Sequence, residues 1–251
     1  MLALAACGGN GDDGETTTFD TDTTVTTTHE TTTTTSEETT KLRVYFMRDG
    51  YVQPVAREVP KTLAVAKAAL DALEKGPTAA EADLGLVNSL ESYEDLSVRL
   101  EKDGVLRVFE VRGAAEPALA QIVYTFTQFP TVKQVAVQGK RYTRADFEDW
   151  TPAILVESPL PFETASNPLR ASGTANTFEA NFQYELLDPA GKVVDENFVT
   201  ATSGTGTRGT FDFTTKRYTG QAGEGTLVVF ELSAKDGSRI NEVRIPVQLS
   251  P

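Results

Sequence analysis

Residues 16–40 form a threonine tract that restricts stable folding to the rest of the chain. Sixteen of these 25 residues are threonine, and Phe19 and Val25 are the only large apolar residues among them. Without apolar side chains to bury, a segment cannot offset the entropy that is lost when its backbone becomes ordered. We therefore expect residues 8–40 to be a disordered linker and residues 41–251 to hold the folded structure.

The same linker is strongly acidic. Residues 8–40 contain eight Asp and Glu residues and no Lys or Arg, so they carry most of the formal net charge of −13. A flexible coil of this length averages about 30 Å from end to end and reaches about 110 Å when fully stretched. These properties favour a stalk that holds folded domains away from a membrane. A plain disordered N-terminus is the alternative.

Cys7 distinguishes between these two interpretations. It is the only cysteine and it follows Leu4-Ala5-Ala6. This pattern resembles the lipobox of bacterial lipoproteins, in which the thiol is acylated and the mature chain begins at the cysteine. Residues 1–7 are then a truncated signal, because a complete leader has a charged region and about 7–15 apolar residues. The resemblance predicts lipidation at Cys7 and anchoring to the extracytoplasmic face of the cell membrane. An ordinary free thiol is the alternative.

The remaining composition excludes several classes of protein. The only histidine, His29, lies in the linker, which excludes histidine-based triads and histidine metal sites in the folded part. A single cysteine forms no intrachain disulfide, no run of 18 apolar residues is present, and the acidic balance disfavours nucleic acid. We predict a non-enzymatic protein without catalytic residues, cofactor, metal site or nucleic-acid partner.

Composition leaves a carboxylate-dependent enzyme as an alternative. Glu179 is the most suggestive carboxylate, but no second acid lies at a recognisable spacing, so we favour a role in capping a turn. Asp49-Gly50, Asp103-Gly104 and Asp236-Gly237 indicate tight turns rather than calcium ligands. The glycine-rich residues 204–209 precede an expected strand rather than a helix, so they predict a loop rather than a phosphate cradle.

Residues 41–150 combine strand and helix patterns. Apolar side chains suit strands in residues 42–47, 96–100, 105–111 and 132–137, and they recur at helical spacing in residues 61–75 and 116–129. Thr62 is the expected N-cap of the first helix, and Gly76-Pro77 ends it. The order β-α-β-β-α-β predicts an α+β domain, with one small sheet covered on one face by two helices.

Two segments of this unit resemble the GerMN domain of sporulation and spore germination. They are Leu73-Glu74-Lys75-Gly76-Pro77-Thr78 and Gln121-Ile122-Val123-Tyr124-Thr125-Phe126-Thr127-Gln128-Phe129-Pro130. The resemblance implies a fold like the ring-building motifs of secretion systems, which associate side by side, and hence a scaffold rather than chemistry. We interpret Tyr124, Phe126 and Phe129 as core residues. Gln121 and Gln128 are placed to hydrogen-bond a neighbouring strand or a partner.

Residues 153–251 show short alternating segments and no helical period. The expected strands are residues 154–157, 169–175, 179–188, 192–201, 210–215, 226–234 and 242–249. This pattern predicts an all-β immunoglobulin-like sandwich. The side chains expected to face its core are Phe182, Tyr184, Leu186, Phe211, Phe213, Val228, Phe230, Ile245 and Val247. Trp150, the only tryptophan, precedes this unit, and we expect it to pack between the two domains.

This unit also resembles a known family, the immunoglobulin-like domain of bacterial spore germination. The similar segments are Val156-Glu157-Ser158-Pro159, residues 167–180, Leu187-Asp188-Pro189-Ala190-Gly191 and Gly209-Thr210-Phe211. In that family the domain follows a GerMN domain in lipoproteins, which is the order found here. The resemblance therefore also supports lipidation of Cys7.

These expectations describe an extracytoplasmic lipoprotein that binds or scaffolds partners in the bacterial cell envelope, in sporulation, germination or cell-wall assembly. The expected partners are the membrane, through the lipid anchor, and an envelope protein or peptidoglycan, with weak homo-oligomers as a further option. One alternative is a peptidoglycan- or glycan-binding module with a groove between the domains near Trp150. The other is a cell-wall enzyme that uses carboxylates.

Overall fold

The computed structural model describes residues 38–251. Cys7 and nearly all of the predicted linker therefore lie outside the described residues. The predicted end of the linker is wrong by two residues, because Thr39 and Thr40 begin strand β1 and pair with Pro60 and Val59. Threonine is β-branched and suits a strand once a partner strand is present.

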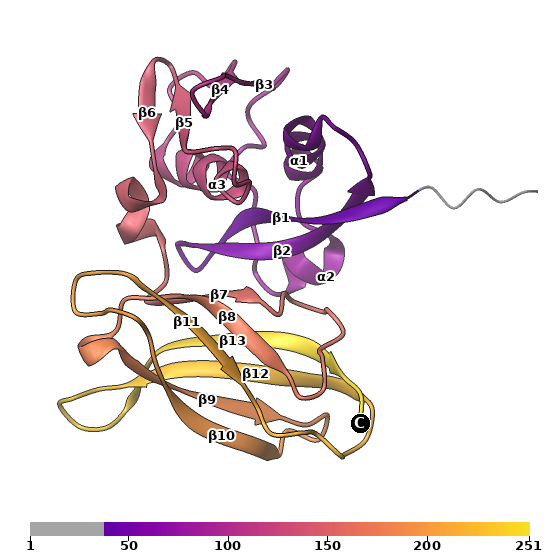
Figure 1. Ribbon diagram of the computed structural model, residues 1–251, viewed down its shortest axis with the longest axis vertical. Helices are drawn as coiled ribbons and strands as arrows, with labels where there is room; N and C mark the ends of the chain where they lie inside the picture. Colours follow the sequence, from indigo (N-terminus) through magenta and orange to yellow (C-terminus); the bar gives the residue numbers. More distant parts are fainter. Residues whose placement is uncertain (1–37) are drawn as a thin grey trace, which may run out of the picture. The chain divides into compact units, whose positions relative to one another are not determined.

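The first folded element is a β-hairpin (Figure 1). Strands β1 (Thr39–Arg48) and β2 (Tyr51–Pro60) pair antiparallel around Asp49-Gly50. Both turn residues have positive φ, 52° for Asp49 and 86° for Gly50, as the type I′ turn requires. Strand β2 was not expected from the sequence, because Pro54 interrupts its pattern. The proline is tolerated because β2 is an edge strand.

Three helices and a second sheet complete the first domain. Their bounds are α1 Val65–Glu74, α2 Ala79–Asp83, β3 Ser97–Leu100, β4 Val105–Phe109, α3 Glu116–Phe126, β5 Gln134–Val137 and β6 Lys140–Tyr142. The strand order of this sheet is β3-β4-β5-β6, and β4 and β5 are parallel. Both α1 and α3 contact the hairpin as well as the second sheet (Figure 1). The helices are therefore the layer that joins the two sheets.

The α+β class is confirmed, but the prediction of a single sheet is wrong. The Asp-Gly turn closes a local hairpin, so β1 pairs with β2 and not with the three later predicted strands. The first helix begins at Val65, after Ala64 as its N-cap, and not near residue 61. Thr62 lies before the helix, where its hydroxyl accepts a hydrogen bond from the Ala64 N–H. Gly76 ends the helix at a φ of 75°.

Polar side chains at the C-terminal end of α3 and just beyond it satisfy the free backbone edge of β1. Gln128 Oε1 accepts the Arg43 N–H at 2.8 Å, and Gln128 Nε2 donates to the Arg43 carbonyl. Thr125 Oγ1 accepts the Tyr45 N–H at 3.1 Å. The prediction that Gln128 bonds a neighbouring strand is confirmed. These contacts occupy backbone groups that would otherwise be open to another strand.

The rest of the α3 motif is buried. Gln121 is fully buried and bonds a loop rather than a strand, since its Oε1 accepts the Ser89 N–H at 2.6 Å. Tyr124 and Phe126 are buried in the first core, and Phe129 packs against it partly exposed. The interpretation of these aromatic residues as core is therefore confirmed.

Replacing Gln128 with leucine is expected to lower the free energy of unfolding by about 1–3 kcal/mol, because the Arg43 N–H and carbonyl lose their partner. Urea unfolding of the purified protein measures the change. Gln221→Leu is the control, because Gln221 is exposed and an exposed change costs within about 0.5 kcal/mol. Equal stability of the two variants would contradict the assigned role of Gln128.

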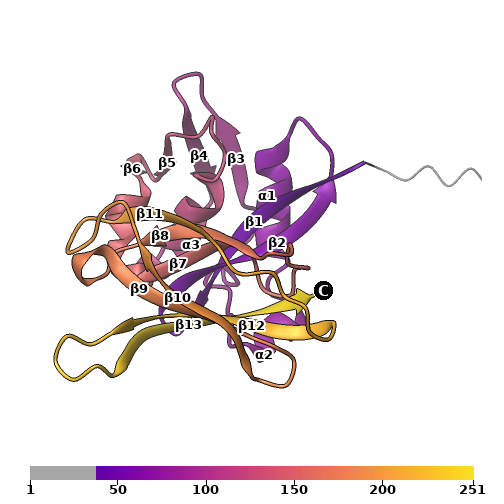
Figure 2. The same ribbon diagram turned by 60° about the horizontal axis from the view of Figure 1, so that its bottom comes forward.

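The second domain is a two-sheet sandwich, seen from another side in Figure 2. Its strands are β7 Ile154–Ser158, β8 Arg170–Ala175, β9 Asn181–Leu187, β10 Val193–Thr200, β11 Gly209–Thr214, β12 Gly223–Leu232 and β13 Arg239–Leu249. One sheet has the order β10-β9-β12-β13, and the other has the order β11-β8-β7. Every strand predicted for residues 153–251 is present, and the immunoglobulin-like sandwich is confirmed.

One predicted core assignment in this domain is wrong. Leu227 and Val229 pack in the sandwich core, whereas Val228 and Phe230 are buried on the other face of β12. The Arg239 guanidinium lies 4.0 Å from the centroid of the Phe230 ring and covers it. Residues 227–230 are all apolar, so alternation alone does not decide their direction, and a shift of one residue reverses it.

The two domains share buried residues where they meet. Leu155 of β7 belongs to the core of the first domain, whereas its neighbours Ile154 and Val156 pack in the second core. Residues 38–251 accordingly fall within a single compact unit. Within this range, no helix has both the length and the apolar character needed to cross a membrane.

Candidate functional site at the domain junction

Arg144 lies at the centre of a polar cluster that joins the domains, which we call the Arg144 cluster (Tyr45, Arg144 and Glu157). Arg144 begins η1 (Arg144–Trp150), a 3₁₀ segment after β6. Its Nη1 lies 2.9 Å from Glu157 Oε1 in the second domain, and its Nε donates to Thr127 Oγ1 at 2.8 Å. The guanidinium also lies 4.6 Å from the centroid of the Tyr124 ring. Arg144 is therefore held by groups from both domains.

The charges of this cluster are fixed by its burial and its partners. The Tyr45 hydroxyl donates a hydrogen bond to Glu157, and burial raises the pKa of Tyr45 above its ordinary value. Burial also raises the pKa of Glu157, but the charge of Arg144 and the Tyr45 hydrogen bond outweigh it and lower that pKa overall. At neutral pH the cluster thus contains a carboxylate, a guanidinium and a neutral phenol.

A second ion pair joins the domains through Arg208. Arg208 Nε lies 2.9 Å from Glu148 Oε2, and Arg208 Nη2 lies 3.0 Å from Glu148 Oε1. Arg208 also donates to the Pro152 carbonyl, and Asn176 donates to Glu148 at 2.8 Å. Burial raises the pKa of Glu148, but hydrogen bonds from Arg208 and Asn176 lower it overall. Because the contact is bidentate, it fixes orientation as well as distance.

The glycine-rich segment predicted as a loop positions Arg208. The Gly206 N–H donates to Asn176 Oδ1 at 2.9 Å. A Cβ on Gly204 would lie 2.4 Å from the Thr177 carbonyl oxygen, so only glycine allows this approach. The loop prediction is confirmed for residues 204–208, whereas Gly209 begins β11 (Gly209–Thr214). Gly204 and Gly209 serve close packing, and Gly206 provides a φ of 92°.

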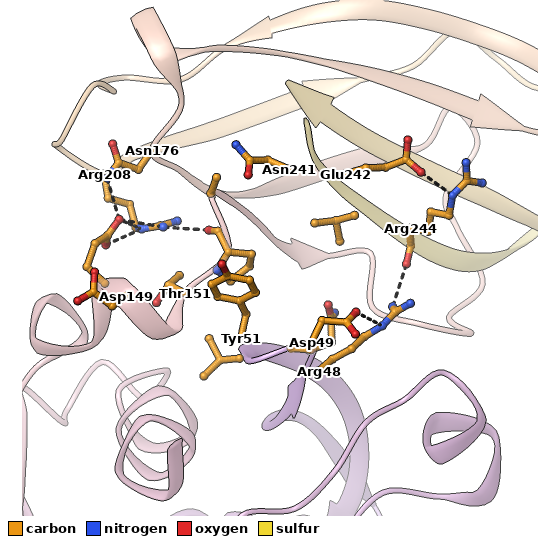
Figure 3. A pocket seen from close by; sticks show the side chains of 16 residues that line it. Arg48, Asp49, Tyr51, Asp149, Thr151, Asn176, Arg208, Asn241, Glu242 and Arg244 are labelled. Atoms are coloured by element: carbon orange, nitrogen blue, oxygen red, sulfur yellow. Dashed lines mark hydrogen bonds and ion pairs between the residues drawn. The ribbon is translucent and has the colours of Figure 1, made fainter. Parts of the chain in front are cut away.

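A cleft opens between the two domains beside Arg208, which we call the junction cleft (Figure 3). Its volume is about 520 Å³. The β1–β2 turn forms one wall, the end of η1 and the following residues form another, and the second domain forms the third. The polar and aromatic side chains that line it belong to Arg48, Asp49, Tyr51, Gln53, Glu148, Asp149, Thr151, Asn176, Arg208, Asn241, Glu242 and Arg244.

Most charges in the junction cleft are already paired. Arg48 lies 3.6 Å from Asp49, and Arg244 lies 2.7 Å from Glu242. Tyr51 stays 44% exposed, and its ring projects into the cleft in Figure 3. An aromatic face among paired polar groups suits a polar ligand that also has apolar faces, such as a sugar ring or a peptide.

The hydroxyl group that Thr151 brings to the junction cleft is already hydrogen-bonded within the protein. Thr151 is the only serine or threonine that lines the cleft. Its hydroxyl donates to the Phe147 carbonyl at 2.8 Å and pairs with the Tyr124 hydroxyl at 2.5 Å. A nucleophile needs an adjacent general base, and Thr151 is bonded to neither a carboxylate nor an amine.

Trp150 and Glu179 do not take the places predicted for them. Trp150 packs against the first core, and its indole N–H donates to Glu116 at 2.8 Å. Its side chain does not line the junction cleft, although its neighbours Asp149 and Thr151 do, so a groove lies near Trp150 without using its ring. Glu179 lies in η2 (Phe178–Ala180) at a φ of 52°, and its backbone N–H donates to Thr205 at 2.9 Å. Its backbone, not its carboxylate, supports the turn.

The three Asp-Gly pairs form tight turns, as predicted. In addition to the β1–β2 turn, Asp103 accepts the Val105 N–H at 3.2 Å, and Asp236 accepts the Ser238 N–H at 3.1 Å. Their carboxylates thus bond to the turn backbone itself. Over residues 38–251, no group of three or more His, Cys, Asp or Glu side chains is arranged to hold a metal ion.

The residues that join the domains were not predicted from the sequence. Glu157 follows the apolar Ile154–Val156, and an acid that ends a buried strand needs a cationic partner. That signal was present in the sequence, but its partner, Arg144, was not identifiable. The pairing of Glu148 with Arg208 joins residues 60 positions apart, so no local pattern reveals it.

Family comparisons agree with the architecture. The family described as "Sporulation and spore germination" matches residues 43–141, and the "Immunoglobulin-like domain of bacterial spore germination" matches residues 153–238. No curated protein matches the chain.

Two solved structures show limited similarity. The tandem GerMN domains of the sporulation protein GerM from Bacillus subtilis are 26% identical, over 39% of this chain and 38% of that chain, with a TM-score of 0.31. CopC from Methylosinus trichosporium OB3b is 17% identical, over 39% of this chain and 91% of that chain, with a TM-score of 0.26. This chain thus spans less than half of the GerM structure. At these TM-scores neither match bears on function.

The family matches coincide with the two domains seen in the structure, and their order along the chain is the expected one. Residues 43–141 therefore belong to the GerMN family of sporulation and spore-germination domains, and residues 153–238 belong to the immunoglobulin-like domain of bacterial spore germination.

Proposed function

We propose that this chain is a non-enzymatic binding protein of the bacterial cell envelope, whose two domains form one rigid module. A lipid on Cys7 anchors it to the extracytoplasmic face of the membrane, and residues 8–38 act as the stalk. The junction cleft binds a polar ligand of the envelope, and the ligand that we propose is peptidoglycan. We propose that this binding serves sporulation, germination or cell-wall assembly.

The junction cleft is the observation that carries this proposal. Its walls come from both domains, which the Arg144 cluster and the Glu148–Arg208 ion pair hold together. A preformed site avoids the cost of ordering its walls when a ligand binds. Peptidoglycan offers sugar rings for the face of Tyr51 and amide and hydroxyl groups for the polar walls.

Co-sedimentation with purified peptidoglycan tests the proposal. We expect the wild-type chain to sediment, and Tyr51→Ala to weaken binding about tenfold, which corresponds to about 1.4 kcal/mol. Phe198→Ala is the matched control, because Phe198 is an aromatic residue that is 71% exposed away from the cleft. It should bind like the wild type.

The other outcomes are equally informative. Release of soluble fragments would show a cell-wall enzyme and overturn the non-enzymatic proposal. Absence of both sedimentation and release would overturn peptidoglycan binding and leave an envelope protein as the partner. Equal loss in the two variants would contradict the role of Tyr51.

Cell fractionation tests the anchor independently of the ligand. The wild-type chain should be found with the membranes, and Cys7→Ser should appear in the medium. Mass spectrometry of the membrane form should show acyl chains on Cys7. Continued membrane association of Cys7→Ser would contradict the lipid anchor but not the binding site.

A further inference from the structure

A second pocket at the domain junction carries a different chemistry. We call it the Arg43 pocket. Its volume is about 430 Å³, and it shares no lining residue with the junction cleft. Arg43, Lys133 and Arg144 provide three cationic side chains to its wall, and Glu157 provides the only acid. A cationic pocket is unexpected in a chain whose net charge is −13.

The single acid of this pocket already has hydrogen-bond partners within the protein. Glu157 bonds to Arg144 and to Tyr45, so its charge is compensated within the Arg144 cluster. Arg43 makes one hydrogen bond to Glu157, from Nη1 to the backbone carbonyl oxygen at 3.2 Å, and none to its carboxylate. Among the described residues, Arg43 and Lys133 belong to no ion pair, in contrast to Lys41. The charge of Arg43 helps to lower the pKa of Glu157, but the Arg43 and Lys133 side chains are hydrogen-bonded to no carboxylate among the described residues, so both can donate to a ligand.

The two free cations are attached to well-fixed backbone. Gln128 holds both the N–H and the carbonyl of Arg43. The Lys133 N–H donates to the Gly104 carbonyl at 2.8 Å, and the Lys133 stem packs so closely that a Cβ on Gly104 would lie 3.1 Å from Lys133 Cγ. Fixed attachment lowers the entropy cost of bringing both charges to one anion.

A neighbouring pocket extends this site into the second domain. It has a volume of about 540 Å³ and shares Arg43 and Glu157 with the Arg43 pocket. Hydroxyl groups line its far side, from Ser172, Thr174, Thr200, Thr202 and Thr210. Asp212 also lines it, and Arg170 compensates the charge of that carboxylate at 2.6 Å. Arg43 therefore lies where a cationic pocket meets a hydroxyl-lined one.

We propose that Arg43 and Lys133 bind an oxyanion, a phosphate or carboxylate group of an envelope ligand, whose polar remainder lies along the hydroxyl-lined pocket. Guanidinium and ammonium groups are the side chains that recognise such oxygens, since they donate charge-assisted hydrogen bonds. This site is separate from the junction cleft and does not depend on peptidoglycan binding there.

Titration of the ¹⁵N-labelled full chain, followed by NMR, tests the site. The probes are inorganic phosphate, acetate and glycerol phosphate. We expect saturable shifts of the amide signals of residues 43, 128 and 133, and a dissociation constant at least tenfold higher in Arg43→Gln/Lys133→Gln. The matched control, Arg112→Gln/Lys192→Gln, removes two exposed cations elsewhere and should bind like the wild type.

Vesicles distinguish the sources of the anion. Binding to phosphatidylglycerol vesicles but not to neutral phosphatidylcholine, and not to the soluble probes, would assign the site to lipid headgroups. Binding to soluble probes would assign it to free or polymer-linked anions. Absence of binding to every probe, or equal binding by both double variants, would overturn the proposal. If Arg43→Gln lowers the melting temperature, binding is compared between the wild type and the single variant Lys133→Gln. Lys133 is exposed, so its replacement should not disturb the fold.

Discussion

Replacing Arg144 with alanine is expected to lower the free energy of unfolding by about 3–5 kcal/mol, because the change leaves the Glu157 carboxylate buried without its cation. The Glu157 side chain is only 14% exposed, so water compensates little. The same change also removes the contact of the guanidinium with the rings of Tyr45 and Tyr124. Urea unfolding followed by fluorescence measures the loss.

Two variants control this measurement. Arg112→Ala removes a guanidinium whose side chain is 86% exposed, and its effect should stay within about 0.5 kcal/mol. Arg144→Ala/Glu157→Gln should regain part of the loss, since no buried charge is left alone. A loss below about 1 kcal/mol in Arg144→Ala would mean that the cluster behaves like an exposed ion pair.

The Arg144 cluster also gives stability a defined pH dependence. The pKa of Glu157 in the folded protein is lowered from its ordinary value of 4.5. The ionised carboxylate therefore adds stability above about pH 4.5, and this contribution disappears as the pH falls through the lowered pKa. In Glu157→Gln that part of the acid sensitivity should be absent. Unfolding curves measured between about pH 3 and pH 7 compare the two proteins.

Replacing Gly173 with alanine is expected to cost about 3 kcal/mol, at the upper end for an added methyl group in a packed site. A Cβ at this position would lie 2.0 Å from the Leu155 carbonyl oxygen and 2.9 Å from the Phe211 ring. Strand β7 has a register shift between Val156 and Ser158 opposite Gly173. The methyl group would displace β7 backbone, not a flexible side chain.

The effect of Gly173→Ala should spread to the first domain. Strand β7 carries Leu155 of the first core and Glu157 of the Arg144 cluster. We therefore expect reduced hydrogen-exchange protection at Tyr45 as well as a lower melting temperature. Ser172→Ala, one residue earlier on the same strand, is the control and should change little. Unaltered protection at Tyr45 would show that the two domains are not coupled through β7.

Several parts of the fold were predictable because their signals are local. The strands of the second domain alternate and end at turn residues, and the Asp-Gly turns need positive φ that few other residues adopt. The helix at residues 116–126 was predictable from apolar spacing and from Pro117 near its start. Where apolar residues are continuous, as in residues 227–230, local pattern was not enough.

The candidate sites depend on contacts that no local pattern contains. Arg43 meets Gln128 and Glu157 from positions 85 and 114 residues away along the chain. The junction cleft combines the turn at Asp49 with residues 241–244 of the last strand. The order of charges along the sequence does not show which Arg and Glu residues form ion pairs. It therefore does not show which cations stay outside ion pairs either.

The sequence alone determined the class of each domain and their order along the chain. These properties depend on composition and on the spacing of apolar residues, which are local quantities. The tertiary structure decided how the domains are joined, because a buried carboxylate such as Glu157 is stable only when a distant cation is brought to it. It also decided how the hairpin of β1 and β2 is attached to the second sheet, since α1 and α3 contact both.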